Sequence, residues 1–292
     1  MKYSVFTVSM PEHPVEKVPA LLADWGYDGV EWRVVDQPDA PKPSFWRGNR
    51  ATILESEALA RAKEIKKLTR AAGLTIMGLG TYCDCDASVK RLSYLMETAR
   101  AMGTRNLRVG TPYYDGSKNY VPMFNKAQKQ YARVAKLAEK FGVRASVEMH
   151  PNQLTPSASA AMRFLTPFSP KHVGVIYDVG NMVREGFERY RMGLGLLGKY
   201  LSHVHLKNGM VKKAGKDKDG ATIWAGKAAS LKAGQMDLGD FMNKLVQVGY
   251  DGWISLEDFS SGSSLSRLKN GVEYLKVLEK RAKSKKGKKS KK

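Results

Sequence analysis

Cysteine and long hydrophobic runs are both scarce in this chain. The 292 residues include two cysteines, Cys83 and Cys85, whose spacing is poor for a disulfide bond and which are too few for a structural zinc site. No apolar run approaches the roughly 18 residues that span a bilayer, and the stretch before Met10 lacks the apolar core of a signal peptide. These absences predict a cytoplasmic protein in a reducing compartment.

Acidic residues are also few relative to basic ones. Lys and Arg number 49 against 28 Asp and Glu, which gives a formal net charge of +21. The stretch 280–292 is rich in lysine and contains no acid, as is typical of solvated, disordered tails. We therefore expect one domain over residues 1–280 and a disordered basic tail over 281–292. The tail could contact nucleic acid weakly and non-specifically.

Short apolar runs alternate with helical patterns along the chain. Hydrophobic residues make up 42% of the sequence, as in soluble globular proteins. We expect strands at 5–8, 29–35, 74–79, 106–109, 144–149, 173–177, 201–206 and 252–256. Helical patterns occupy 15–25, 55–72, 88–102, 121–141, 186–200, 238–248 and 265–281. This alternation predicts an α/β fold, and its size matches a single-domain (β/α)8 TIM barrel.

An open, doubly wound sheet is the alternative architecture. It would require a phosphate-binding glycine loop after the first strand, where the sequence instead has Pro11-Glu12-His13-Pro14. Two longer insertions, 36–49 and 207–235, follow strands and would lie over the carboxyl-terminal mouth of a barrel. The mouth loops also carry aromatic residues that could either contact a sugar ring or pack the loops onto the barrel: Phe45, Trp46, Tyr113, Tyr114 and Trp224. Their lysines, with Arg33, Arg108 and Lys207, could meet a phosphate or carboxylate.

Polar side chains end four successive strands, at the edge where a barrel builds its active site. They are Glu148, Asp178, His205 and Glu257. Neighbouring strands lie about 4.8 Å apart, so four inward-facing ends would converge on one ion. Three carboxylates and one imidazole suit a divalent cation such as Mn²⁺, Mg²⁺ or Co²⁺. Without a cation, the carboxylates would repel one another and their pKa values would rise.

Each of these residues also has a purely structural explanation. A carboxylate after a strand commonly caps a helix, and Asp178 could simply form a turn. The joint pattern on four successive strands favours a site. Of the two histidines in the seventh strand, we expect His205 to face the barrel interior and His203 to pack between sheet and helix.

The strand-end motifs resemble those of a known family. They are Tyr-Asp-Gly-Val-Glu at 27–31, Val-Glu-Met-His at 147–150, Asp-Val-Gly-Asn at 178–181, His-Val-His-Leu-Lys at 203–207, and Gly-Tyr-Asp-Gly-Trp at 249–253 leading into Leu256-Glu257. Over roughly residues 1–280, the chain resembles the sugar phosphate isomerase/epimerase family. These are xylose isomerase-like TIM barrels that include ketose 3-epimerases and inosose dehydratases.

The resemblance implies roles for particular residues. Four would bind a divalent metal ion, with Mn²⁺ expected first and Mg²⁺, Co²⁺ or Zn²⁺ as alternatives: Glu148, Asp178, His205 and Glu257. The two glutamates would also form the catalytic acid/base pair. Contacts to the substrate are expected from Glu31, His150, Asn181 and Lys207. Epimerases commonly carry a histidine at the position of Asn181, a departure that bears on 3-epimerase activity and not on the metal site.

These roles predict a definite chemistry. A metal on a carbonyl oxygen and the adjacent hydroxyl stabilises the enediolate that forms when the intervening proton leaves. One glutamate would take this proton and the other would return it. We therefore expect a metal-dependent sugar isomerase or epimerase. A lyase or dehydratase acting on a keto-sugar, inosose or 3-keto-glycoside is the alternative, because the same intermediate can expel a leaving group. We also expect a homo-oligomer, with a partner subunit as a further option.

Two other functions are disfavoured. The positive charge would suit a DNA-repair endonuclease of the same superfamily. The resemblance to such enzymes would imply a three-zinc site with many histidines, and this chain has five histidines. A non-catalytic barrel that binds nucleic acid through its tail is the second. The retention of all four expected ligands argues against a barrel that has lost catalysis.

Overall fold

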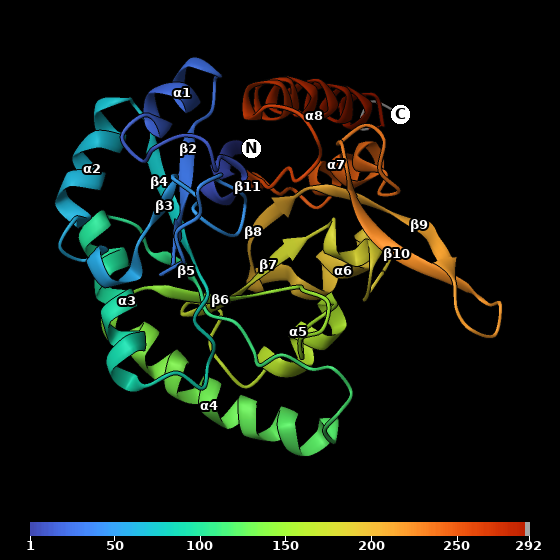
Figure 1. The fold of residues 1–292 in the computed structure, drawn as a ribbon, viewed down its shortest axis with the longest axis horizontal. Helices are drawn as coiled ribbons and strands as arrows, with labels where there is room; N and C mark the ends of the chain where they lie inside the picture. Colours follow the sequence, from blue (N-terminus) through green and yellow to red (C-terminus); the bar gives the residue numbers. More distant parts are fainter. Residues whose placement is uncertain (290–292) are drawn as a thin grey trace.

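Eight parallel strands close into a barrel (Figure 1). The structure, a computed structural model, describes residues 1–289. The barrel strands are β1 (Lys2–Phe6), β2 (Gly29–Val34), β4 (Thr75–Thr81), β5 (Asn106–Arg108), β6 (Arg144–Glu148), β7 (Val173–Asp178), β8 (Leu201–Leu206) and β11 (Trp253–Leu256). The first strand closes the barrel, because Val5 lies opposite both Val30 of β2 and Leu256 of β11. The short β3 (Thr52–Ile53) pairs with β2 outside this ring. The predicted TIM barrel is confirmed.

Helices surround the barrel strands (Figure 1). They are α1 (Val18–Asp24), α2 (Ala62–Ala71), α3 (Val89–Met102), α4 (Tyr120–Phe141), α5 (Ala158–Leu165), α6 (Tyr190–Leu197), α7 (Leu238–Gln247) and α8 (Asn270–Lys289). The sequence did not predict α5, which has only eight residues. Ser157 caps α5 by accepting a hydrogen bond from the Ala160 N–H. Within the helix, Phe164 and Leu165 are buried. No helix in the described part of the chain is long and apolar enough to cross a membrane.

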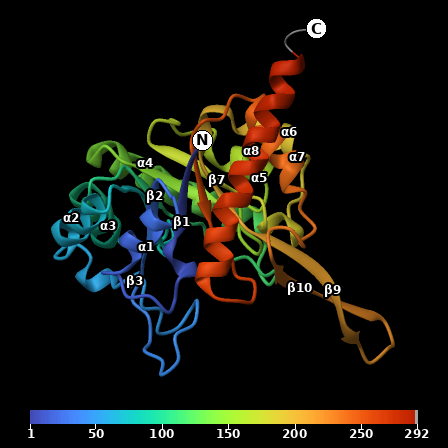
Figure 2. The same ribbon diagram turned by 90° about the horizontal axis from the view of Figure 1, so that it is seen from above.

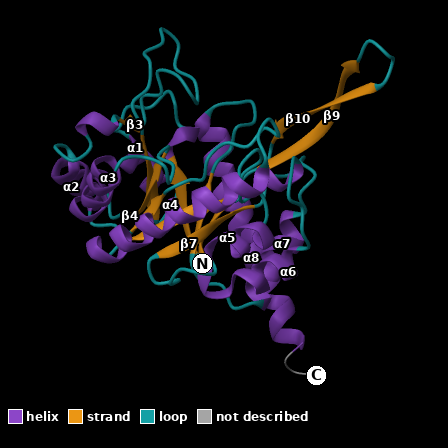
Figure 3. Ribbon diagram, turned by 90° about the horizontal axis from the view of Figure 1, so that it is seen from below, coloured by secondary structure: helices purple, strands orange, loops and turns teal. Residues whose placement is uncertain are grey.

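The insertion after β8 forms a hairpin rather than a loop. It consists of β9 (Asn208–Lys216) and β10 (Thr222–Ala229), paired antiparallel. Figures 2 and 3 show this hairpin projecting from the same end of the barrel as the loop that precedes β3. Its outer part is exposed, with Ile223 and Trp224 turned to solvent, whereas Ala229 at its base is buried. The two insertions therefore lie at one end of the barrel, as expected.

Residues 281–289 of the expected tail belong to α8, which continues to Lys289. Lysine, arginine and alanine are good helix formers, and cations near a helix C-terminus interact favourably with its dipole. Ala282 is buried, and Lys283 forms an ion pair with Glu279 one turn earlier at 2.6 Å. The rest of the expected tail, 290–292, lies outside the described residues. The described end of α8 and the hairpin lie at opposite ends of the barrel (Figure 2).

Candidate metal centre and active site

Four strand ends bring their polar side chains to one point. Glu148 ends β6, Asp178 ends β7, His205 lies near the end of β8, and Glu257 directly follows β11. The barrel register aligns them, because Asp178 and Ser255 both lie opposite His205. One potential ligand atom from each of the four residues lies within 4.8 Å of the others, and all four side chains are buried. The convergence expected from the sequence is present, and its role as a metal site stays a prediction.

The His205 imidazole stands between two carboxylates. Its Nδ1 lies 3.5 Å from Glu148 Oε1 and 3.4 Å from Glu257 Oε1. Although fully buried, Nδ1 has no hydrogen-bond partner in the described part of the chain. Its Nε2 lies 2.9 Å from Glu31 Oε2. The Phe6 ring stacks on the imidazole at 5.6 Å between ring centroids. One ring nitrogen is therefore fixed by Glu31, and the other is left to face the carboxylates.

His203 lies beside His205 and not between sheet and helix. Residues two apart on a strand point to the same side of the sheet, so the expectation that these histidines face opposite ways was wrong. His203 Nε2 lies 3.2 Å from His205 Nε2 and 3.5 Å from Glu31 Oε1. Glu31, His203 and His205 thus form a second buried group with metal-capable atoms, which shares His205 with the first. Burial lowers the pKa of His203 below its usual value, although Glu31 opposes this shift.

Two cations neutralise the carboxylates. Arg108 Nη1 lies 2.5 Å from Glu148 Oε2, and its Nε donates to the Thr81 carbonyl at 2.8 Å. Lys207 Nζ forms ion pairs with both Asp178 and Glu257. The Arg108 guanidinium also lies over the Tyr82 ring, 4.4 Å from its centroid. These cations let three carboxylates share one buried site.

The pKa values reflect this neutralisation. Burial favours a raised pKa for Glu148, but the Arg108 guanidinium and His205 hold the pKa of Glu148 well below its usual range. Burial is likewise outweighed at Glu257, where Lys207 and His205 lower the pKa. At Asp178, burial outweighs the opposing effect of Lys207, and repulsion from Glu257 and Glu148 adds to it, so the pKa of Asp178 rises to about 7. The expected rise thus occurs at Asp178 alone among the three carboxylates.

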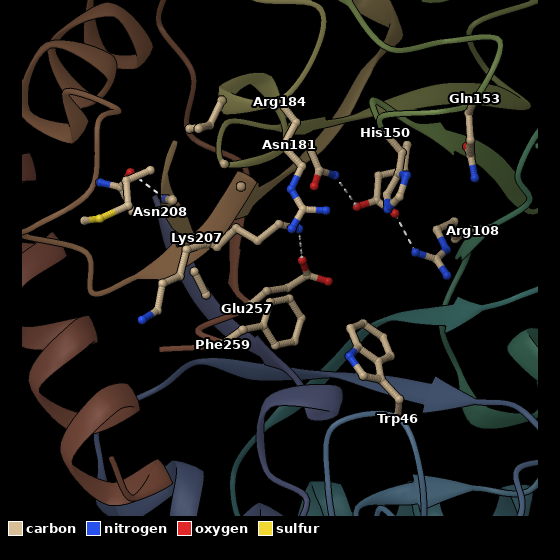
Figure 4. Close-up of a pocket in the computed structure, with 18 of the residues that line it drawn as sticks. Trp46, Arg108, His150, Gln153, Asn181, Arg184, Lys207, Asn208, Glu257 and Phe259 are labelled. Atoms are coloured by element: carbon tan, nitrogen blue, oxygen red, sulfur yellow. Dashed lines mark hydrogen bonds and ion pairs between the residues drawn. The ribbon is translucent and has the colours of Figure 1, made fainter. Parts of the chain in front are cut away.

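The residues expected to contact substrate occupy different places. His150, Asn181 and Lys207 line a cavity of about 350 Å³ above the four strand ends (Figure 4). Asn181 Nδ2 donates to Asp178 Oδ2 at 2.8 Å and to the Met149 carbonyl at 3.0 Å. Glu31 is 1% exposed and does not line this cavity. Its neighbours are the two histidines, so its position suits orienting His205 better than touching a substrate.

The cavity walls come from elements that the sequence did not resolve. The base of the β9–β10 hairpin forms one wall, and Trp46 and Phe259 contribute aromatic surface to the cavity at 5.3 Å between their ring centroids. Figure 4 labels two further lining residues, Gln153 and Arg184, that were not expected. The tight packing here, where a Cβ on Gly180 would lie 2.8 Å from the Lys207 carbonyl oxygen, is a property of the folded chain that no local sequence pattern signals. Of the expected aromatic residues, only Trp46 lines the cavity.

The other aromatic candidates have other surroundings. Phe45 packs edge-on against Phe259 at 5.1 Å, and Tyr114 packs against Tyr120 at 5.4 Å between ring centroids. Tyr113 and Trp224 are both mostly exposed. The Arg33 guanidinium donates hydrogen bonds to Gln37 and Thr52 and lies over the Tyr82 ring. Arg33 therefore stabilises the loop after β2.

The donor set fits a divalent cation. Three carboxylate oxygens and one imidazole nitrogen are ligands that Mg²⁺, Mn²⁺ and Zn²⁺ accept. The buried, unpartnered Nδ1 of His205 faces the carboxylates, as a ligand nitrogen must. Its other nitrogen is held by a carboxylate, which is the usual arrangement behind a metal-binding histidine.

A closed barrel with a polar cluster at the carboxyl ends of its strands defines a TIM-barrel protein with a candidate metal centre. The family model for xylose isomerase-like TIM barrels matches residues 19–278, and the chain belongs to this family. The expected resemblance is thereby confirmed at the level of the family. A search of curated proteins finds no match.

Solved structures of related fold cover nearly the whole chain. The E. coli 3-keto-D-glucoside 4-epimerase is 14% identical and covers 95% of this chain and 99% of its own, with a TM-score of 0.69. A xylose isomerase-like TIM barrel protein from Mycobacterium smegmatis in complex with magnesium is 17% identical and covers 96% and 97%, with a TM-score of 0.66. The probable 3-DHS dehydratase from Bacillus anthracis is 16% identical and covers 94% and 99%, with a TM-score of 0.68. At these identities the similarity shows the shared fold.

Proposed function

We propose that the protein is a divalent-metal-dependent sugar isomerase or epimerase. The observation that carries this proposal is the convergence of Glu148, Asp178, His205 and Glu257 within 4.8 Å at the base of a cavity. The family of the chain and the epimerase fold among its structural neighbours support it. The neighbour in complex with magnesium supports a divalent ion, and we keep Mn²⁺ as the first expectation.

The metal ligands would be the four converging residues. A divalent cation held there would polarise the carbonyl group of a bound sugar and acidify the proton on the adjacent carbon. Glu31 keeps the His205 ring in place through its bond to Nε2, which leaves Nδ1 directed at the carboxylates. The Asn181 side-chain amide donates a hydrogen bond to the Asp178 carboxylate and so helps to hold it in place.

The two glutamates are suited to move the substrate proton. Glu148 and Glu257 flank the His205 imidazole, and each has one oxygen turned to a different cation, Arg108 or Lys207. Their lowered pKa values keep both ionised at neutral pH, as a proton acceptor must be. One carboxylate would take the proton from carbon and the other would return it. Return to the same carbon on the opposite face inverts that carbon, and return to its neighbour interconverts aldose and ketose.

Elimination is the alternative outcome of the same proton abstraction. If the β-carbon carries a leaving group, the electron pair that remains after proton loss expels it, and the product is an enone. The dehydratase among the neighbours of similar fold supports keeping this alternative. The reaction products distinguish the two, because an epimerase conserves the substrate formula and a dehydratase releases water.

The test is solvent exchange at carbon. The Mn²⁺-loaded protein is incubated in D₂O with ketoses, inososes and 3-keto-glycosides, and deuterium in the recovered sugars is measured. We expect exchange with at least one class, and a loss of about 10²- to 10⁴-fold in Glu148→Gln and Glu257→Gln. Gln130→Glu, a change on α4 outside the cavity, serves as the control and keeps the activity. Exchange that survives in both glutamate variants would refute the assigned roles.

A further inference from the structure

Two cations on the cavity wall have no acidic partner among residues 1–289. Arg184 directly follows η3 (Asn181–Val183), Lys227 lies on β10, and both line the cavity. The ion pairs found in the described part of the chain include neither of them, in contrast to Arg108 and Lys207. The acids nearest to Arg184 in sequence are engaged elsewhere. Glu185 accepts a hydrogen bond from the Asn152 N–H at 2.8 Å, and Glu188 accepts one from the Ser159 N–H at 3.3 Å.

The hairpin backbone supports the Arg184 side chain. A Cβ added to Gly226 of β10 would lie 2.6 Å from Arg184 Nε and 3.2 Å from its Cγ, so the side chain lies against the bare backbone of this glycine. Val183 approaches Gly209 of β9 in a similar way, at 3.8 Å from the corresponding point. Figure 4 shows Arg184 extending toward Lys207 and Glu257. The guanidinium is thus directed to the cavity by packing, without any acid to hold it.

The charge of the cavity is unbalanced. Two carboxylates and four cationic side chains line it: Glu148 and Glu257 against Arg108, Arg184, Lys207 and Lys227, with Asp178 paired to Lys207 beside the cavity. A divalent cation at the candidate metal centre would increase the positive excess. Arg184 and Lys227 are both exposed to solvent, so an anionic group on a bound sugar could pair with them, whereas a neutral sugar would not engage their charge.

We infer that the substrate carries an anionic group, a phosphate or a carboxylate, which Arg184 binds with Lys227 as a second cation. This inference rests on the proposed function. The planar guanidinium matches two oxygens of either anion, and such charge-assisted hydrogen bonds are stronger than neutral ones. Because Arg184 and the two glutamates are different lining residues of the cavity, the anionic group and the reacting carbon would be bound by different side chains.

Binding without turnover tests this inference. Calorimetric titration of the full chain in magnesium compares D-fructose, D-fructose 6-phosphate and D-fructuronate. We expect at least one anionic probe to bind about tenfold tighter than fructose or more, and this preference to weaken as salt rises. Tighter binding of the phosphate ester assigns a phosphate, and tighter binding of the uronate assigns a carboxylate. Equal affinities for all three probes, or no binding of any, would overturn the inference.

Variants locate the preference. Arg184→Gln should abolish the advantage of the anionic probe over fructose, and Gly226→Ala should weaken this advantage by displacing the guanidinium. Arg189→Gln removes the same charge from an exposed residue outside the cavity and should keep the preference. A preference that survives in Arg184→Gln contradicts the assignment. Anion-selective binding without solvent exchange would refute the proposed function alone, and exchange with neutral sugars only would refute this inference alone.

Discussion

Removal of the Glu31 carboxylate should weaken metal binding indirectly, through the loss of its contact with His205. Glu31 Oε2 lies 2.9 Å from His205 Nε2, and Oε1 lies 3.5 Å from His203 Nε2, in a position that is 1% exposed. Glu31→Ala leaves both histidine nitrogens without this acceptor and frees the His205 ring to turn. A buried polar group without a partner costs about 1–3 kcal/mol of stability. Loss of a carboxylate behind a ligating histidine lowers metal affinity by about 10- to 100-fold.

Two measurements separate these effects. Urea unfolding of the metal-free protein gives the change in free energy of unfolding, and calorimetric titration with Mn²⁺ gives the change in affinity. Glu31→Gln keeps an oxygen that His205 can donate to, so its loss of affinity should be smaller than that of the alanine variant. Glu16→Ala, which changes an exposed glutamate paired with Arg61, is the control. If Glu31→Ala binds Mn²⁺ as tightly as the wild type and only the KM for sugar changes, Glu31 contacts substrate and does not orient His205.

Three further predictions concern the proton on Asp178, the packing of Gly80 and the hydrogen bond of Tyr3. The apparent Mn²⁺ affinity should increase between pH 6 and pH 8, because the metal-free protein must release the proton of Asp178, whose pKa is raised to about 7; a pH-independent affinity in calorimetry would contradict this. Gly80→Ala should lower the free energy of unfolding by about 1–3 kcal/mol, since its Cβ would lie 2.1 Å from a Phe6 ring atom; an unchanged urea midpoint would exclude this clash. Tyr3→Phe should cost about 1 kcal/mol in the same assay, because the Tyr3 hydroxyl donates to Glu279 in a buried contact at 2.5 Å; no change would show that this bond adds no net stability.

The barrel could be predicted because its signals are local and repeated. Each strand is an apolar run, and glycines such as Gly103 and Gly142 end the intervening helices with positive φ values of 86° and 63°. The strand ends also fix where Glu148, Asp178, His205 and Glu257 lie. Once parallel strands are in register, residues at equivalent depths meet without further information.

Other features depend on long-range contacts that no local pattern encodes. Arg108 and Lys207 were expected near a substrate anion, but they pair with the carboxylates of the site. Arg184 was not expected at all, because its place depends on how η3 packs against the bare backbone of Gly226. The helical end of α8 was not expected, because a block of like charge masks the helix propensity of lysine and the burial of Ala282.

Anomalous X-ray diffraction from crystals grown with Mn²⁺ tests the central claim most directly. The account predicts one manganese peak per chain, coordinated by carboxylate oxygens of Glu148, Asp178 and Glu257 and by Nδ1 of His205. A peak between Glu31 and the two histidines, or no peak within reach of these four residues at saturating Mn²⁺, would contradict it.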